Sequence, residues 1–93
     1  MDLLNKTAII TGGSGGIGKA MAKAFLKEGA KGIVLADLNR DTVEKAAKEL
    51  GCDSMVCNVT DEQQIQDVAT FTKEKFGQID LFCSNAGAGG EGL

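Results

Sequence analysis

Residues 7–18 read TAIITGGSGGIG, and this stretch decides the fold of the chain. Its first five residues form a short apolar run rich in β-branched side chains, which is typical of a buried strand. Residues 11–18 hold five glycines, and apolar side chains at helical spacing begin at Ile17. A strand, a glycine-rich turn and a helix in this order predict the first unit of a parallel sheet with crossover helices.

The glycine-rich turn has the composition of a phosphate-binding loop. Phosphate oxygens accept hydrogen bonds from backbone N–H groups, and the start of the next helix adds free N–H groups and partial positive charge. We expect Gly12 to permit the tight turn, Gly16 the close approach of a pyrophosphate, and Gly18 the packing of helix against strand. The Ser14 hydroxyl can reach a phosphate or ribose oxygen. The candidate phosphate-binding residues are therefore Gly12, Ser14, Gly15, Gly16, Ile17 and Gly18.

Two other interpretations of this loop compete with a dinucleotide site. A flexible surface turn without a ligand is also rich in glycine. A kinase-like P-loop is disfavoured, because no Lys-Ser or Lys-Thr pair closes the loop.

Apolar spacing and turn residues divide the rest of the chain into alternating strands and helices. Three further strands are predicted, at residues 33–36, 54–57 and 79–84. The predicted helices run from Ile17 to a glycine cap at Gly29, from the Asn39 cap to Gly51, and from a capping box at Thr60 and Gln63 to Gly77.

This order predicts an α/β fold, a partial, Rossmann-like doubly wound parallel sheet with strand order 3-2-1-4. Ligands bind such sheets where the strand order reverses, here between the first and fourth strands. The first two helices would cover one face and the third helix the other. The fourth strand would then be an open apolar edge at Leu81, Phe82 and Cys83, so we expect marginal stability or pairing with another copy or a missing segment.

Asp37 follows the second predicted strand, 19 residues after Gly18. A carboxylate about 20 residues beyond the glycine motif accepts hydrogen bonds from the adenosine ribose hydroxyls. Its charge repels a 2′-phosphate, and Leu38 supplies no compensating cation, so NAD is favoured over NADP. Arg40 is near enough to leave NADP open. The alternative role for Asp37 is a strand end or helix cap, although Asn39 is the better cap.

Composition excludes several kinds of chemistry. The 93 residues include no His and no Tyr, so neither a Ser-His-Asp triad, nor a His-ligated metal, nor a phenol proton donor can be built from them. The net charge is -3 without a basic block, which disfavours a nucleic-acid partner, and no apolar run is long enough for a membrane span. Three cysteines without a C-x-x-C pair or a signal peptide indicate free thiols and a cytoplasmic location.

Three motifs in register resemble the short-chain dehydrogenases/reductases. Residues 11–18 match the cofactor motif, residues 58–61 (NVTD) resemble the segment after the third strand, and residues 85–87 (NAG) match the motif after the fourth. The resemblance covers residues 3–87 in the family's order. It implies an NAD(H)-dependent oxidoreductase that interconverts a small alcohol and a ketone, commonly as a homo-oligomer of four subunits.

The resemblance also implies further cofactor-binding residues. The Asn58 side chain and the Val59 N–H would contact the adenine ring, where the family more often has Asp at the first position. Asn85, Ala86 and Gly87 would line the adenosine ribose and tie the fourth strand to its neighbours. Ser84 departs from the Asn often found there. With Asp37 and Leu38, these residues complete the predicted NAD site.

The family's Tyr-x-x-x-Lys pair and its catalytic Ser and Asn lie farther along the chain than Leu93. We therefore expect residues 1–87 to be the NAD-binding portion of a longer enzyme, with residues 88–93 a glycine-rich loop leading to a catalytic part. The 93 residues alone would not be catalytic. The alternative is a non-catalytic polypeptide that binds nucleotides or a partner chain.

Overall fold

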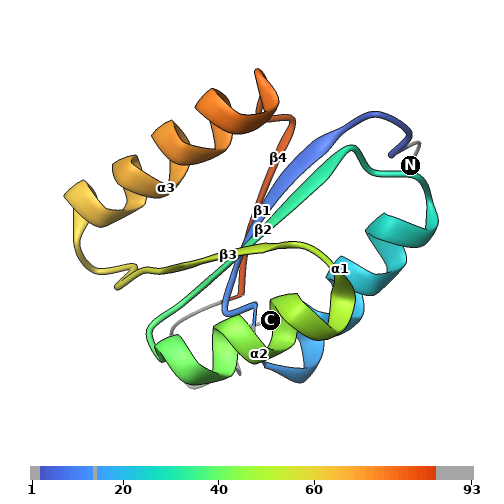
Figure 1. Ribbon diagram of the computed structural model, residues 1–93. Coiled ribbons are helices and arrows are strands. Elements are labelled where there is room, and N and C mark those ends of the chain that lie inside the picture. The colour runs from blue at the N-terminus through green and yellow to red at the C-terminus, as the bar shows by residue number, and fades with distance from the viewer. Residues whose placement is uncertain (1–2, 14, 86–93) are drawn as a thin grey trace.

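The computed structural model describes residues 3–13 and 15–85. Strands and helices alternate along these residues as predicted (Figure 1). The elements are β1 (Thr7–Thr11), α1 (Gly16–Lys27), β2 (Gly32–Asp37), α2 (Arg40–Leu50), β3 (Asp53–Val56), α3 (Glu62–Phe76) and β4 (Leu81–Ser84).

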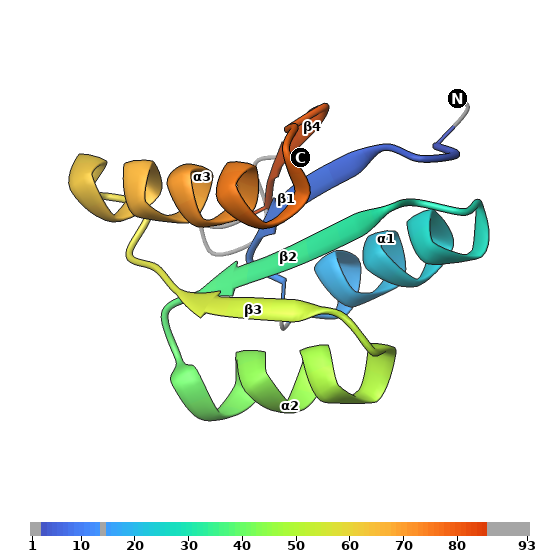
Figure 2. The same ribbon diagram turned by 45° about the horizontal axis from the view of Figure 1, so that its top comes forward.

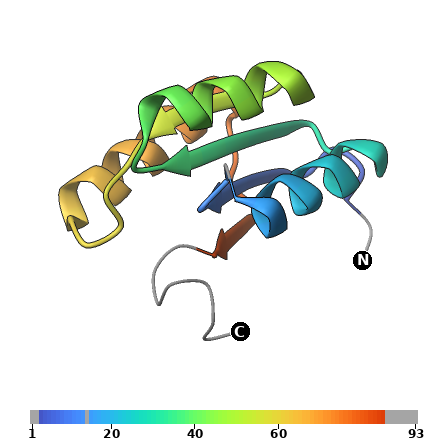
Figure 3. The ribbon, with the colours of Figure 1, turned by 90° about the horizontal axis from the view of Figure 1, so that it is seen from below.

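The four strands form one parallel sheet in the order β3-β2-β1-β4, which confirms the predicted 3-2-1-4 topology. At the carboxyl end of β1, Thr11 pairs with Ala36 of β2 on one side and with Ser84 of β4 on the other. The arrowheads of β1, β2 and β4 therefore lie along the same edge of the sheet (Figure 3). The loops that follow these strands start side by side, as a binding site at the switch point requires.

The helices cover the two faces of the sheet unequally, as predicted (Figure 2). On one face, Ala22 of α1 and Val43 and Ala46 of α2 pack against the sheet. On the other face, Val68 of α3 packs over Ile9 and its neighbours in the sheet, and Ile65, Phe71 and Phe76 of the same helix are partly buried beside it. Alternation along the central strands sends successive apolar side chains to opposite faces, which explains why β1 and β2 are almost continuously apolar.

Helix ends match the predicted signals at three positions and differ at two. Asn39 accepts the N–H of Thr42, while Gly51 and Gly77 end their helices in the left-handed conformation. The predicted Thr60 cap is wrong, because Asp61 caps α3 through the N–H groups of residues 63 and 64. Thr60 instead donates its N–H and hydroxyl to the Asn58 side chain. The predicted end of α1 also moves by one position, since Glu28 is its cap and Gly29 follows it with a φ of 90°.

β4 begins at Leu81 rather than at the predicted residue 79, because Asp80 makes contacts of its own. Its carboxylate accepts the Thr7 N–H at 2.8 Å and the Gln78 amide at 2.6 Å, and its N–H donates to the Thr7 carbonyl at 2.9 Å. These bonds hold the start of β4 against the start of β1. The bond from the Thr7 N–H, and then that from Gln78, lower the pKa of Asp80 from 3.8.

Asp80→Asn is expected to lower the melting temperature at about pH 7 and to have little effect at about pH 2. A carboxyl whose pKa is lower in the folded state stabilises that state above its unfolded pKa, and this contribution is lost as the pH falls through the folded pKa. Thermal unfolding of both proteins across this range measures the gap between them. A gap that stays constant down to the lowest pH would contradict a role for the Asp80 charge.

Within residues 3–13 and 15–85, no helix is both long enough and apolar enough to cross a membrane.

Candidate functional site

A cavity of about 320 Å³ opens at the carboxyl edge of the sheet, beside the glycine-rich loop. Three segments that are distant in sequence contribute to its wall: the turn after β1, the end of β2 and the segment after β3. Its lining residues are Gly12, Asp37, Leu38, Cys57, Asn58, Val59 and Thr60. The structure thus brings together predicted residues from the glycine loop, the β2 carboxylate position and the segment after β3.

Glycine is required in the loop for three separate steric reasons. Gly12 has a φ of 68°, which confirms the predicted tight turn. A Cβ at Gly18 would overlap the Gly12 carbonyl oxygen and lie 2.8 Å from the Gly13 Cα, so this glycine packs against the loop backbone rather than against the strand. Gly13, for which the spacing gave no role, faces the Leu35 side chain, whose Cβ would lie 2.7 Å from an added methyl.

Gly16 differs from these glycines because no described protein atom lies within 4 Å of the Cβ that it lacks. Packing inside the chain therefore does not require glycine at this position. Gly15 is similar, since an added Cβ would meet only the Gly12 carbonyl at an ordinary 3.5 Å. The open side of the loop lies at Gly15 and Gly16.

The start of α1 is left without the side-chain cap that the other two helices have. Its N-cap residue is Gly15, and its first turn holds no acidic residue. In contrast, Asn39 and Asp61 cap α2 and α3, and each of those helices has an acidic residue in its first turn. The N-terminal amides of α1 and the positive end of its dipole are thus suited to an anion, which the described residues do not supply.

Asp37 ends β2 at the rim of the cavity, where its side chain is half-buried. Its carboxylate accepts the N–H of Leu38 at 2.8 Å, which fixes the orientation of the carboxylate. Leu38 is 67% exposed and supplies an apolar surface beside it. Because Asn39 caps α2, the alternative role of Asp37 as that helix's cap is excluded.

Asn58, which also lines the cavity, is held by a local turn. Its Oδ1 accepts the Thr60 N–H at 3.0 Å and the Thr60 hydroxyl at 2.7 Å, and its own N–H donates to Gln64 at 2.8 Å. These bonds order the segment that carries Val59. They also mean that the oxygen expected to accept from adenine already accepts two hydrogen bonds.

Cys57 contributes a neutral wall to the cavity. It is buried, and burial is the main reason why its pKa is raised, with the Asp61 charge second. Burial likewise raises the pKa of Cys52, to about 11, and that of Cys83. All three are free thiols, and the described residues contain no group of side chains that could hold a metal ion.

Asn85 lies next to the loop but is not among the residues that line the cavity. Its N–H donates to the Thr11 carbonyl at 3.2 Å, so the expected tie between β4 and β1 is present. Its side-chain amide donates to the Met21 sulfur in α1, also at 3.2 Å. The predicted site residues Ser14, Ala86 and Gly87 lie outside the described residues.

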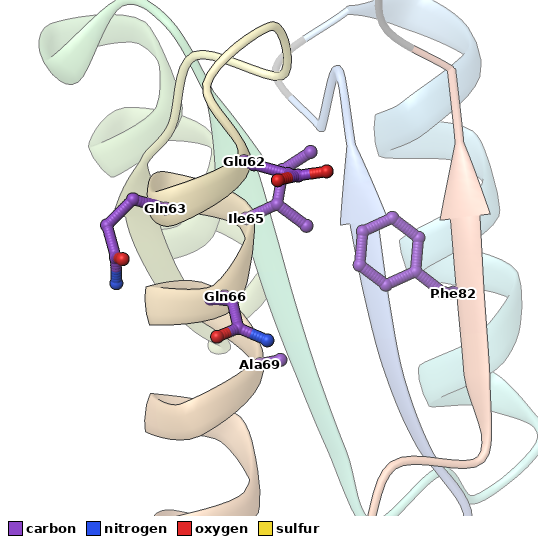
Figure 4. Close-up of a pocket in the computed structure, with 6 residues that line it drawn as sticks. All are labelled: Glu62, Gln63, Ile65, Gln66, Ala69 and Phe82. Carbon is purple, nitrogen blue, oxygen red and sulfur yellow. The ribbon is translucent and has the colours of Figure 1, made fainter.

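A second pocket, of about 550 Å³, lies between α3 and the edge strand β4. Figure 4 shows the Phe82 ring turned toward α3, where Ile65 and Ala69 face it. Phe82 is 46% exposed, whereas Leu81 and Cys83 are half-buried against the α1 and α2 face. The predicted apolar edge is therefore exposed mainly at Phe82, and this pocket contains none of the predicted cofactor-binding residues.

Comparison with known proteins places these features in one family. The family model described as short chain dehydrogenase matches residues 6–93. The chain is 39% identical over 88 residues to a (+)-cis,cis-nepetalactol synthase from Nepeta racemosa and 38% identical over 88 residues to the mitochondrial (-)-isopiperitenol/(-)-carveol dehydrogenase of Mentha piperita. Each alignment covers 91% of this chain and 33% of the relative. The chain thus spans about a third of the length of these curated relatives.

Solved structures of a dehydrogenase and a reductase also match this chain. An NAD+-bound xylitol dehydrogenase matches with a TM-score of 0.74 and 32% identity over 88% of this chain and 33% of the other. The 3-ketoacyl-(acyl-carrier-protein) reductase from Brucella melitensis, complexed with NADH, matches with a TM-score of 0.80 and 32% identity. That alignment covers 86% of this chain and 33% of the reductase.

Proposed function

Because this chain belongs to the short-chain dehydrogenase family, we propose that it binds NAD(H) in the cavity between Gly12, Asp37 and Asn58. It would form the cofactor-binding part of an oxidoreductase that interconverts a small alcohol and a ketone. The observation that carries this proposal is the convergence of three separate segments on one cavity beside the uncapped start of α1. The NAD+ and NADH in the two similar solved structures support the choice of cofactor.

The residues present fit a dinucleotide. The space beside Gly16 is where a Cβ would project and no described protein atom lies, so a phosphate can approach the backbone there. The N–H groups of residues 16–18 would bind the pyrophosphate with help from the Ser14 hydroxyl, whereas the Gly15 N–H already donates to the Gly12 carbonyl at 3.1 Å. The Val59 N–H would contact the adenine, and so would the side-chain N–H2 of Asn58, because the Asn58 oxygen already accepts two bonds from Thr60. Leu38 would cover the ring. Asn85, Ala86 and Gly87 would line the side nearest β4.

Asp37 supports NAD over NADP. A carboxylate accepts hydrogen bonds from two ribose hydroxyls but repels the charge of a 2′-phosphate. The adjacent Leu38 offers no cation to offset that repulsion.

When bound, the nicotinamide supplies the hydride donor or acceptor, and the residues described above bind and orient the dinucleotide. The proton-transfer step of the family uses a Tyr, and these 93 residues include none. Oxidation of small alcohols by the whole protein, monitored by NADH absorbance, tests the proposed reaction, and a protein that binds NAD without turnover would contradict it.

Asp37→Ala is expected to weaken NAD binding about tenfold to 150-fold, the loss of hydrogen bonds to a charged acceptor worth about 1.5–3 kcal/mol. NADP binding should strengthen relative to NAD, because the repelling charge is gone. Calorimetric titration of the wild type and the variant with both dinucleotides measures these changes. An unchanged preference would mean that Asp37 does not contact the ribose.

We also propose that the protein is a homo-oligomer and that it is located in the cytoplasm. Family resemblance supports a homo-oligomer, which light scattering tests, and the free thiols support the cytoplasm, which fractionation tests.

A further inference from the structure

The cation closest in sequence to the Asp37 and Leu38 pair is held by a neighbouring acid. Arg40 is the first residue of α2, and its Nη1 lies 3.3 Å from Oε2 of Glu44, one helical turn farther on. Both side chains lie on the surface, 69% and 56% exposed. The Asn39 cap accepts the Thr42 N–H at 3.1 Å and thus fixes the first turn from which Arg40 projects.

Without Glu44, Arg40 would be directed differently. A long side chain on a helix points back toward the N-terminus, and for Arg40 that direction leads to the end of β2. An arginine near the ribose position would be a strong ligand for a 2′-phosphate, because its planar guanidinium donates two parallel hydrogen bonds to phosphate oxygens. The ion pair instead draws the guanidinium along α2.

We propose that Glu44 is a specificity-determining residue of the dinucleotide site, because it holds the Arg40 guanidinium away from the position of a 2′-phosphate. This inference rests on the proposed function. Asp37 excludes NADP by its own charge, and Glu44 withholds the nearby cation that would otherwise offset that charge. Glu44 is a positioning residue, which acts only through Arg40.

The gain in NADP affinity on releasing Arg40 from Glu44 should be small. An exposed pair four residues apart on a helix is weak, and this pair has the less favourable order, with the cation N-terminal to the acid. Arg40 also lies at the positive end of the α2 dipole, which is unfavourable for a cation in the first turn. Release of Arg40 should therefore strengthen NADP binding only about two- to threefold at low salt.

The test is calorimetric titration with NAD and NADP of four proteins: the wild type, Asp37→Asn, Asp37→Asn with Glu44→Gln, and the triple variant that adds Arg40→Gln. Asp37→Asn gives the background in which NADP binding is measurable. We expect Glu44→Gln to strengthen NADP binding two- to threefold in that background and to leave NAD binding unchanged. The gain should disappear in the triple variant and at high salt, where exposed pairs are screened.

Glu49→Gln in the same background is the matched control. It removes an acid from the same helix, but one that pairs with Lys19 at 2.9 Å, so the ratio of NADP to NAD affinity should not change. A gain that persists without Arg40 would overturn the role of Glu44 in holding it. So would the absence of any gain in a protein that binds NAD, and in that case the proposed function stands. Failure of the wild type to bind either dinucleotide would overturn the proposed function and this inference together.

Discussion

Gly18→Ala is expected to lower the free energy of unfolding by about 2 kcal/mol and to weaken NAD binding at least about 100-fold. Alanine is normally the better helix former by about 1 kcal/mol. Here, however, its methyl group would overlap the Gly12 carbonyl oxygen and lie 2.8 Å from the Gly13 Cα, and these backbone atoms cannot rotate away. Such overpacking costs about 3 kcal/mol, so the steric term exceeds the helix gain.

The loss of affinity has a separate cause. Relief of the overlap moves the loop away from the start of α1, and at least two backbone hydrogen bonds to the pyrophosphate would be lost. At about 1.5 kcal/mol or more for each bond to a charged group, that loss is at least about 100-fold. Thermal unfolding and NAD titration measure the two effects independently, and the melting temperature should fall by about 8–16 °C.

Gly16→Ala is the matched control in the same loop. No described atom lies within 4 Å of its new methyl group, so the melting temperature should stay level or rise. The methyl group would instead occupy the space proposed for the phosphate, and NAD binding should fall about tenfold or more. Equal destabilisation by both variants would contradict the steric distinction between these glycines.

Gly32→Val is expected to lower the free energy of unfolding by about 2 kcal/mol, although valine is a much better strand former than glycine. Gly32 begins β2 on the face that α3 covers, and an added Cβ would lie 2.6 Å from Cδ1 of the Phe76 ring. The gain in strand propensity is about 1 kcal/mol at most, whereas forcing the ring outward costs about 3 kcal/mol.

A double-mutant cycle with Phe76→Leu tests this contact directly. The shorter side chain leaves room for the valine, so Gly32→Val should cost at least about 1 kcal/mol less in that background. Chemical denaturation of the four proteins gives the coupling free energy. A coupling near zero, or a wild-type background in which valine is stabilising, would show that Phe76 does not require glycine at this position.

Gly32 and Gly13 illustrate how far the sequence predicts the fold. Local signals located all seven elements, and parallel alternation with short crossovers gave the strand order. The Phe76 ring that covers Gly32 and the Leu35 side chain that faces Gly13 lie 44 and 22 residues away from them in sequence, so no local pattern indicated either contact. The error at Thr60 has a local cause, because the next residue, Asp61, accepts the N–H groups of residues 63 and 64, while Thr60 donates to the Asn58 side chain.

The candidate site was predictable to the same extent. Residues at the ends of adjacent parallel strands must lie near one another, so the meeting of Gly12, Asp37 and Asn58 followed from topology. The hydrogen-bond partners of each side chain did not follow from topology. Spacing gave no indication that the Asn58 oxygen accepts two bonds from Thr60.

Titration of the protein with NAD, followed through its backbone amide resonances, tests the proposed site most directly. The amides that shift should be those of the glycine loop and the start of α1, residues 37–38 at the end of β2, and residues 58–59 after β3. The larger pocket between α3 and β4 provides the competing outcome. Shifts confined to Glu62, Gln66, Ala69 and Phe82, or no shifts at saturating NAD, would contradict a dinucleotide site beside Gly16 and Asp37.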